Sequence, residues 1–236
     1  MNTEKQVEMG DFRMQELEYE EAYGYYLEAA LDNNPKAIYN LGLIYLYGRG
    51  VTADYKKAFH YLTLYFDLTG EYDMLWRIME MRSDILPNAA WEEQYREFLE
   101  YLLTNKVWDV CIIMANEYLE GKIYPKDSDK AIELYQKARQ NGIAMASECL
   151  AEMYFLGAEV GQDYEMAYEL LMDHEGTMSF IKPYYLGLMY KNGYYVPQNR
   201  ALARGKFKEI VDSKLMMKEC DDYYLLAKKE LENIGV

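Results

Sequence analysis

The side chains that most often carry enzyme chemistry are few and scattered in this chain. It has two histidines, His60 and His174, and three cysteines, Cys111, Cys149 and Cys220. Histidine supplies general acids, bases and metal ligands, and cysteine supplies nucleophiles, disulfides and metal ligands. The histidines lie 114 residues apart, and the cysteines form no cluster. We therefore expect a structural or surface role for the histidines, no metal site and no disulfide framework.

Short catalytic motifs are also missing from the sequence. The pair Gly48 and Gly50 lacks the preceding strand and the Lys-Ser/Thr of a phosphate loop, so we interpret it as a turn. No Gly-x-Ser-x-Gly nucleophile motif occurs. The acid pairs Glu20-Glu21 and Glu92-Glu93 lie on polar helical stretches and are interpreted as solvated. We predict a non-enzymatic protein with no catalytic residue, no metal and no cofactor, although a site converging from distant residues would be invisible here.

Composition favours a helical protein with a large core. Hydrophobic residues make up 51% of the 236 residues, while glycine and proline number only 15 and 5, which suits helices joined by short turns. The 26 tyrosines suit both helix packing and wet binding surfaces, because each ring carries a polar tip. The net charge of −15 disfavours nucleic acid as a partner. It indicates either a solvated acidic surface or a preference for a basic partner.

Localisation is predicted from the cysteines and the apolar runs. The simplest interpretation of an odd, unclustered set of cysteines is that they are reduced, buried thiols in a cytoplasmic protein. The first residues contain no apolar signal core, and no apolar run approaches membrane-spanning length, so we expect no membrane partner. A chain trimmed of its leader would look the same.

The elements that position these side chains repeat along the sequence. Tyr45, Tyr118, Tyr154 and Tyr190 are separated by 73, 36 and 36 residues. Four further sets keep the same spacing. They are Gly42, Ala115, Ala151 and Gly187; Gly48, Gly121, Gly157 and Gly193; Asp54, Asp127, Asp163 and Asn199; and Ala58, Ala131, Ala167 and Ala203. A period in this range indicates stacked supersecondary units.

Each clear unit is predicted as helix, short loop, helix. Apolar residues at helical spacing lead to the tyrosine, and Gly48 follows where a helix C-cap needs a left-handed residue. Asp54 precedes the next helix, where a carboxylate can accept orphan backbone N–H groups. The small residues at Gly42 and Ala58 let the two helices approach closely while the tyrosine fills the adjacent gap.

The spacing predicts a single repeat domain made of successive segments. Residues 11–32 are expected to form the second helix of an N-terminal unit, and the 73-residue interval hides a degenerate unit in which Asp84 occupies the glycine position. Its apolar stripe is predicted at Tyr72, Leu75, Trp76 and Met79 and, after a cap at Asn88, at Trp91, Tyr95, Phe98, Leu99 and Leu102. The predicted segments are 1–34 (cap and half repeat), 35–70, 71–106 (degenerate), 107–142, 143–178, 179–214 and 215–236 (capping helix).

The best copy of the unit resembles a known repeat. It contains Leu41-Gly42-x-x-Tyr45, then Gly48-x-Gly50-Val51-x-x-Asp54, then Lys57-Ala58. This pattern is similar to the Sel-1-like repeat, a relative of the tetratricopeptide repeat, over roughly residues 15–211. The resemblance implies an all-α, right-handed α-solenoid of stacked antiparallel helix pairs and a role as adaptor or scaffold for protein partners.

The resemblance also implies where a partner binds. In tetratricopeptide-like solenoids the first helix of each pair lines the concave face, with exposed positions at fixed offsets from the packing tyrosine. In this chain they offer Lys36, Tyr39, Leu43 and Tyr47; Asp109, Ile112, Asn116 and Glu120; Met145, Glu148, Glu152 and Leu156; and Ile181, Tyr184, Leu188 and Asn192. The middle of this predicted groove is acidic, and its ends are aromatic and apolar.

We predict from these positions a groove for a protein or peptide segment with Lys or Arg and apolar anchors. Carboxylates would set specificity and tyrosines would supply contact energy. The alternative is an ordinary surface, with the tyrosines partly buried between repeats. A self-associating structural module, seen as a homo-oligomer, and a small-molecule or glycan binder are the other functions that the sequence leaves open.

Overall fold

The computed structural model describes residues 2–75, 78, 89–174, 179–213 and 222–234. The regular structure within these ranges is α-helical, which confirms the predicted all-α fold. The helices group into two compact units, Met1–Asn105 and Lys106–Val236, and each unit contains its own buried core. Trp76, Met79, Asp84 and Asn88 of the predicted degenerate repeat lie outside the described residues.

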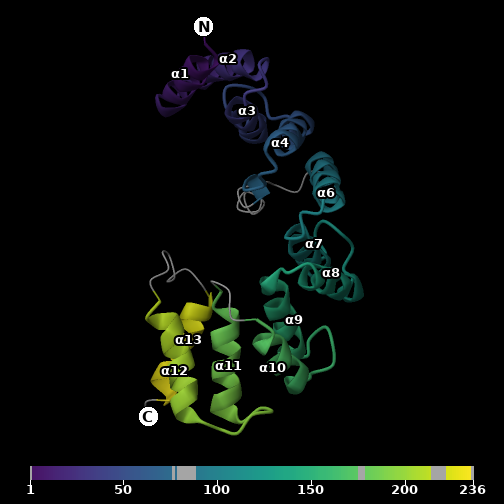
Figure 1. Ribbon diagram of the computed structural model, residues 1–236, viewed down its shortest axis with the longest axis vertical. Coiled ribbons are helices and arrows are strands. Elements are labelled where there is room, and N and C mark those ends of the chain that lie inside the picture. Colours follow the sequence, from purple (N-terminus) through teal and green to yellow (C-terminus); the bar gives the residue numbers. More distant parts are fainter. Residues whose placement is uncertain (1, 76–77, 79–88, 175–178, 214–221, 235–236) are drawn as a thin grey trace. The chain divides into compact units, whose positions relative to one another are not determined.

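The N-terminal unit begins with two helix pairs, each joined by a short connection (Figure 1). A later helix, α6, packs on the second pair and buries an apolar stripe of Trp91, Tyr95, Phe98, Leu99 and Leu102. The helices of this unit are α1 (Thr3–Gln15), α2 (Tyr19–Ala30), α3 (Pro35–Tyr47), α4 (Tyr55–Thr69) and α6 (Ala89–Thr104).

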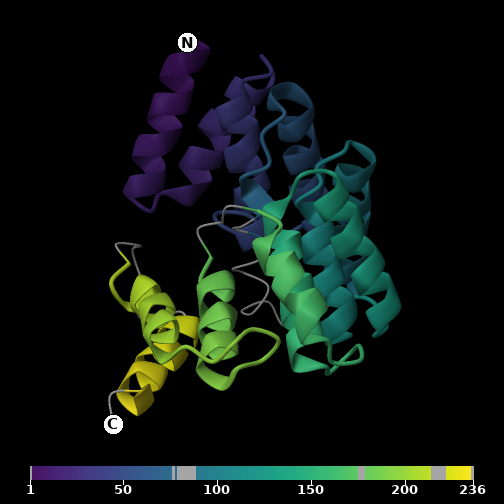
Figure 2. The same ribbon diagram turned by 60° about the horizontal axis from the view of Figure 1, so that its bottom comes forward.

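The C-terminal unit contains three helix pairs and a final helix that packs beside α12 (Figures 1 and 2). Its core joins side chains from all three pairs to Ala227 of the final helix. The helices are α7 (Val110–Glu120), α8 (Ser128–Gln140), α9 (Ala144–Leu156), α10 (Tyr164–Met172), α11 (Ile181–Asn192), α12 (Arg200–Val211) and α13 (Asp222–Ile234).

The start of the chain differs from the sequence prediction. A single helix over 11–32 was expected, whereas α1 ends at Gln15 and α2 begins at Tyr19. Between them Leu17 has φ 63°, which no helix can continue through. The prediction was wrong because the apolar spacing of the two helices runs on in register, and no glycine or proline marks the break.

The turns inside the pairs use one local chemistry. In the four pairs from α3–α4 to α11–α12, a left-handed glycine ends the first helix, at Gly48, Gly121, Gly157 and Gly193, with φ from 66° to 77°. An acidic or amide side chain then accepts the N–H three residues on and caps the second helix. These caps are Asp54, Asp127, Asp163 and Asn199, and each also donates its backbone N–H to the carbonyl of the repeat tyrosine nine residues before it.

Small residues permit close packing inside the pairs. A Cβ on Gly42 would lie 2.7 Å from Leu62, and one on Gly187 would lie 2.5 Å from the ring of Phe207. The alanines Ala58, Ala131, Ala167 and Ala203 of the second helices are fully buried. Each pair is therefore held by a contact too close for larger side chains. No helix in the described part of the chain is both long and apolar enough to cross a membrane.

Candidate functional site

In the N-terminal unit, the predicted groove positions have different environments. Tyr39 is half-buried, with its ring centroid 5.0 Å from that of Tyr65. Leu43 is buried, so its predicted exposure is wrong: it lies in a first helix that is apolar almost all round. Tyr47 is exposed at the end of α3, and the Arg49 guanidinium lies 4.5 Å from its ring centroid. Tyr47 is thus the predicted aromatic that remains accessible in this unit.

The first helix pair of the C-terminal unit keeps most of its predicted positions partly accessible. Asp109 precedes α7, and Ile112 is half-buried against the core. The side-chain oxygen of Asn116 accepts a hydrogen bond from the Tyr135 hydroxyl. Glu120 is exposed and lies 3.0 Å from the Lys122 ammonium. These polar groups are therefore already engaged within the unit.

The acidic centre of the predicted groove is largely buried. Glu148 has no exposed surface, and its Oε1 lies 3.7 Å from Nε2 of His174, so its predicted exposure is wrong. His174 itself lies beyond the end of α10 at Met172. The fold brings these two residues together because α10 packs on α9 and ends beside Ser147, whose hydroxyl donates a hydrogen bond to Asp173.

The other central positions are also occupied. Oε1 of Glu152 accepts hydrogen bonds from the hydroxyls of Tyr185 at 2.7 Å and Tyr223 at 2.6 Å. Tyr184 is buried, which contradicts its predicted exposure, and its ring packs on that of Tyr223 at a centroid distance of 5.4 Å. Leu188 is half-buried against the same core. In this part of the C-terminal unit the predicted groove is filled by the chain itself.

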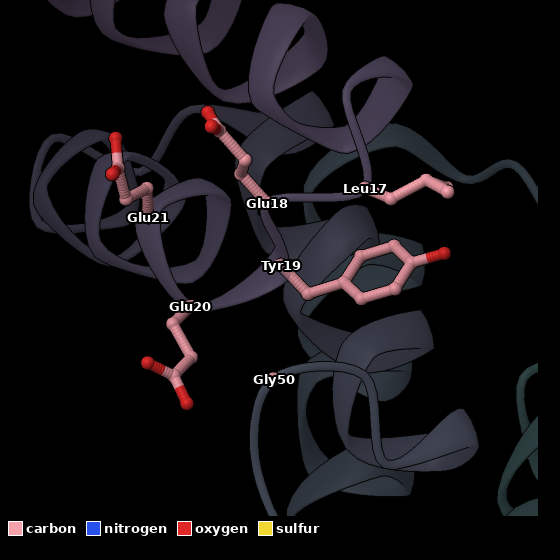
Figure 3. Close-up of a pocket in the computed structure, with 6 residues that line it drawn as sticks. All are labelled: Leu17, Glu18, Tyr19, Glu20, Glu21 and Gly50. Carbon is pink, nitrogen blue, oxygen red and sulfur yellow. The ribbon is translucent and has the colours of Figure 1, made fainter.

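A pocket that the sequence did not predict lies in the N-terminal unit, where the α1–α2 turn meets the α3–α4 loop (Figure 3). Its volume is about 350 Å³. The residues that line it are Leu17, Glu18, Tyr19, Glu20, Glu21 and Gly50.

Two backbone features build the pocket. The left-handed Leu17 ends the turn after α1 and leaves its own side chain 67% exposed. Gly50, at φ 71°, brings the α3–α4 loop against the first turn of α2, where a Cβ would lie 2.6 Å from the backbone N of Glu20. A larger residue at Gly50 would therefore displace the loop that forms one wall.

The side chains around the pocket separate by type. In Figure 3 the side chains of Leu17 and Tyr19 extend in one direction, away from those of Glu18 and Glu20. The pocket thus offers an apolar and aromatic edge beside carboxylates. Glu20 and Glu21 are exposed, as the sequence indicated, but the sequence did not indicate that they line a pocket, because the pocket needs the α3–α4 loop, some thirty residues further on.

Two arginines of the chain border the pocket residues. Arg13 donates a hydrogen bond to Glu18, its Nε lies 3.2 Å from a carboxylate oxygen of Glu21, and the Glu18 hydrogen bond raises the pKa of the guanidinium. The Arg49 guanidinium lies 5.9 Å from the ring centroid of Tyr19 as well as above Tyr47. Arginine is therefore accommodated here in two ways, by carboxylates and by tyrosine faces.

The pocket offers groups for recognition. Its lining contains carboxylates, a phenol and an aliphatic side chain, but no histidine, cysteine, serine or lysine. Among the described residues, no group of three or more His, Cys, Asp or Glu side chains could hold a metal ion.

The helix pairs of the chain match a known repeat profile. The Sel1 repeat profile matches residues 8–34, 35–64, 109–143, 149–171 and 184–205, which together make up more than half of the chain. The chain belongs to the Sel1 repeat family. Proteins of this family generally serve as protein-interaction modules. No curated protein matches the chain.

Solved structures of Sel1 repeat proteins share the fold. The c5321 protective antigen of uropathogenic Escherichia coli strains, described as displaying an SLR fold, superposes with a TM-score of 0.58 at 18% identity. That match covers 97% of this chain and 54% of the antigen, so the chain spans about half of its length. A Sel1 repeat protein from Oxalobacter formigenes superposes with a TM-score of 0.56 at 20% identity. That match covers 95% of this chain and 99% of the Oxalobacter chain.

Proposed function

We propose that this Sel1 repeat protein is a non-enzymatic interaction module that binds a protein segment carrying arginine or lysine beside an apolar side chain. The observation that carries the proposal is the pocket of Leu17, Glu18, Tyr19, Glu20 and Glu21, where carboxylates border an exposed aliphatic and aromatic edge. A basic side chain entering the pocket meets opposite charge, and its apolar neighbour covers Leu17.

Three properties of the chain support a basic ligand. Residues 1–32 carry nine acids and two bases, so the local field attracts cations over the Debye length. Arg13 already forms ion pairs with two of the pocket carboxylates, and the one with Glu18 is hydrogen-bonded. Glu20 is exposed, so its carboxylate can meet an incoming cation. Tyr47, reached through Arg49, extends the aromatic surface next to the pocket.

The remaining groove positions are a second part of the proposal. Tyr39 in the N-terminal unit, and Asp109, Ile112, Asn116, Glu120 and Leu188 in the C-terminal unit, stay proposed contacts for a longer partner. Leu43, Glu148 and Tyr184 are withdrawn from that surface because they are buried.

Fluorescence anisotropy with short labelled peptides tests the pocket. The probe is a peptide with two arginines and two leucines in a Gly-Ser background, and its controls replace either the arginines by glutamine or the leucines by serine. We expect the full-length protein to bind the probe and both controls to bind about tenfold more weakly. Equal affinity for all three peptides would remove the basis of the proposal.

Charge reversal at the pocket gives the matched protein variants. Glu20→Lys should weaken probe binding by about tenfold, and the effect should shrink at high salt. Glu8→Lys makes the same change of charge on α1 of the same unit, at an exposed position outside the pocket lining. Equal losses in the two variants would show that only the general negative charge attracts the probe.

A further inference from the structure

The C-terminal helix α13 is lightly seated on its unit. Of its side chains that the structure describes, only Ala227 is fully buried, and Leu225 and Leu226 remain 54% and 41% exposed. Tyr223 and Tyr224 are partly buried against the core. Since hydrophobic stabilisation scales with the apolar area removed from water, α13 is held less firmly than a helix of the repeats.

The beginning of α13 reaches further than a terminal cap requires. In a stacked array each unit contacts its immediate neighbours. Tyr223, in contrast, passes α11 and donates its hydroxyl to Glu152 on α9, 71 residues earlier. The same Oε1 accepts the hydroxyl of Tyr185 from α11. The α13 tyrosine therefore lies on the face of α9 and α11 at which the sequence predicted a partner.

The contact has the chemistry of a specific anchor. Burial is the main cause that raises the pKa of the Tyr223 phenol, and the hydrogen bond to Glu152 is the second. The same two causes raise the pKa of Tyr185. Both hydroxyls thus stay protonated donors to one carboxylate. Charge-assisted hydrogen bonds of this kind are among the stronger ones in proteins. The ring of Tyr223 also packs on Tyr184, at a centroid distance of 5.4 Å.

A second anchor lies on the same side of α13. Glu230 pairs with the Lys191 ammonium near the end of α11, and both side chains are mostly buried. Positions 223, 227 and 230 follow one another at four and three residues, so they share one face of the helix. α13 thus presents a tyrosine, a buried alanine and a glutamate to its unit.

We propose that α9, α11 and α12 form a helix-binding site that α13 occupies in cis, packed chiefly on α12 with Tyr223 reaching α9, and that the site takes an amphipathic partner helix carrying Tyr and, seven residues later, Glu. Glu152 recognises the phenol, Lys191 recognises the carboxylate, and Tyr184 and Tyr185 form the wall. α13 is then an autoinhibitory segment, because the partner binds only the fraction of molecules in which α13 has left the site. The proposal is independent of the acidic pocket in the N-terminal unit.

A peptide supplied in trans tests the site on the full-length chain. The probe is a labelled peptide of residues 222–234, and its control carries Tyr223→Phe. In the protein, Ala227→Arg unseats α13, because a charged side chain cannot occupy that buried position. We expect the variant to bind the probe at least about tenfold more tightly than the unaltered protein does. We also expect the Phe peptide to bind about tenfold more weakly than the probe.

Adding Glu152→Gln to that variant should reduce the preference for the Tyr peptide, because a neutral amide oxygen is a weaker acceptor than a carboxylate. No binding by a folded Ala227→Arg protein, or equal binding of the two peptides, would overturn the proposal. Hydrogen exchange on the single variant Tyr223→Phe gives a second measurement that does not depend on unseating α13. Amides of α13 should exchange about tenfold faster, with those of α11 and α12 unchanged. Equal acceleration in all three helices would show that α13 is a structural cap and not a separable occupant.

Discussion

Close packing between α11 and α12 predicts different effects on stability for two Gly→Ala changes in the C-terminal unit. Gly187 lies inside α11, and a Cβ there would stand 2.5 Å from the ring of Phe207, which is fully buried. Gly205 lies inside α12, and a Cβ there would meet nothing within 4 Å. Both changes gain about 1 kcal/mol of helix propensity. Only Gly187→Ala also adds overpacking, which costs about 1–3 kcal/mol.

The difference between the two variants therefore isolates the cost of the contact. Gly205→Ala should stabilise the protein by about 1 kcal/mol, and Gly187→Ala should be less stable than it by about 1–3 kcal/mol. In a chain of this size that difference corresponds to about 2–4 °C of Tm for each kcal/mol. Because two units need not unfold together, circular dichroism melts should be paired with hydrogen exchange in α11 and α12. Equal stabilisation by both changes would refute the close contact at Gly187.

Three further changes in stability are expected, two from substitutions and one from raised pH. Gly50→Ala should lower the free energy of unfolding by about 2 kcal/mol, because alanine is strained in the left-handed conformation and its Cβ clashes with the start of α2. Urea unfolding measures this change, and an unchanged midpoint would contradict the pocket geometry. Glu148→Lys should lower the free energy of unfolding by about 3 kcal/mol or more, because it buries an unpaired charge. Glu120→Lys, on the exposed part of the predicted groove, should change it by no more than about 0.5 kcal/mol. Similar effects of the two changes would place Glu148 at the surface. The raised pKa values of Tyr185 and Tyr223 predict stability that is complete below pH ~10, the pKa of an unfolded tyrosine, and is lost as pH rises above it. Melts of Tyr223→Phe should show a weaker loss there, and parallel curves would contradict the shared carboxylate.

The repeat and its turns could be predicted from sequence because their causes are local. A glycine such as Gly48 is needed wherever a helix ends in a left-handed residue, and Asp54 caps the helix that begins beside it. Such residues recur at one spacing whatever surrounds the unit. The same reasoning failed at Leu17, where a non-glycine residue takes the left-handed conformation and divides one expected helix into two.

The groove could be predicted only as a set of helix faces. Counting from the repeat tyrosine selects Glu148 and Glu152 as neighbours on one face of α9. It cannot foresee that His174 approaches Glu148 after α10 or that Tyr223 reaches Glu152 from α13, because these contacts span 26 and 71 residues. The acidic pocket was missed for the same reason, since its loop wall comes from the next helix pair.

The central claim is that a basic and apolar protein segment binds at the acidic pocket of the N-terminal unit. The most direct measurement is an anisotropy titration of the Arg/Leu peptide against the unaltered protein, Glu20→Lys and Glu8→Lys, at low and high salt. We expect saturable binding that Glu20→Lys weakens about tenfold at low salt, that Glu8→Lys leaves nearly unchanged, and that high salt weakens. No saturable binding, or equal affinity for Glu20→Lys and Glu8→Lys, would contradict it.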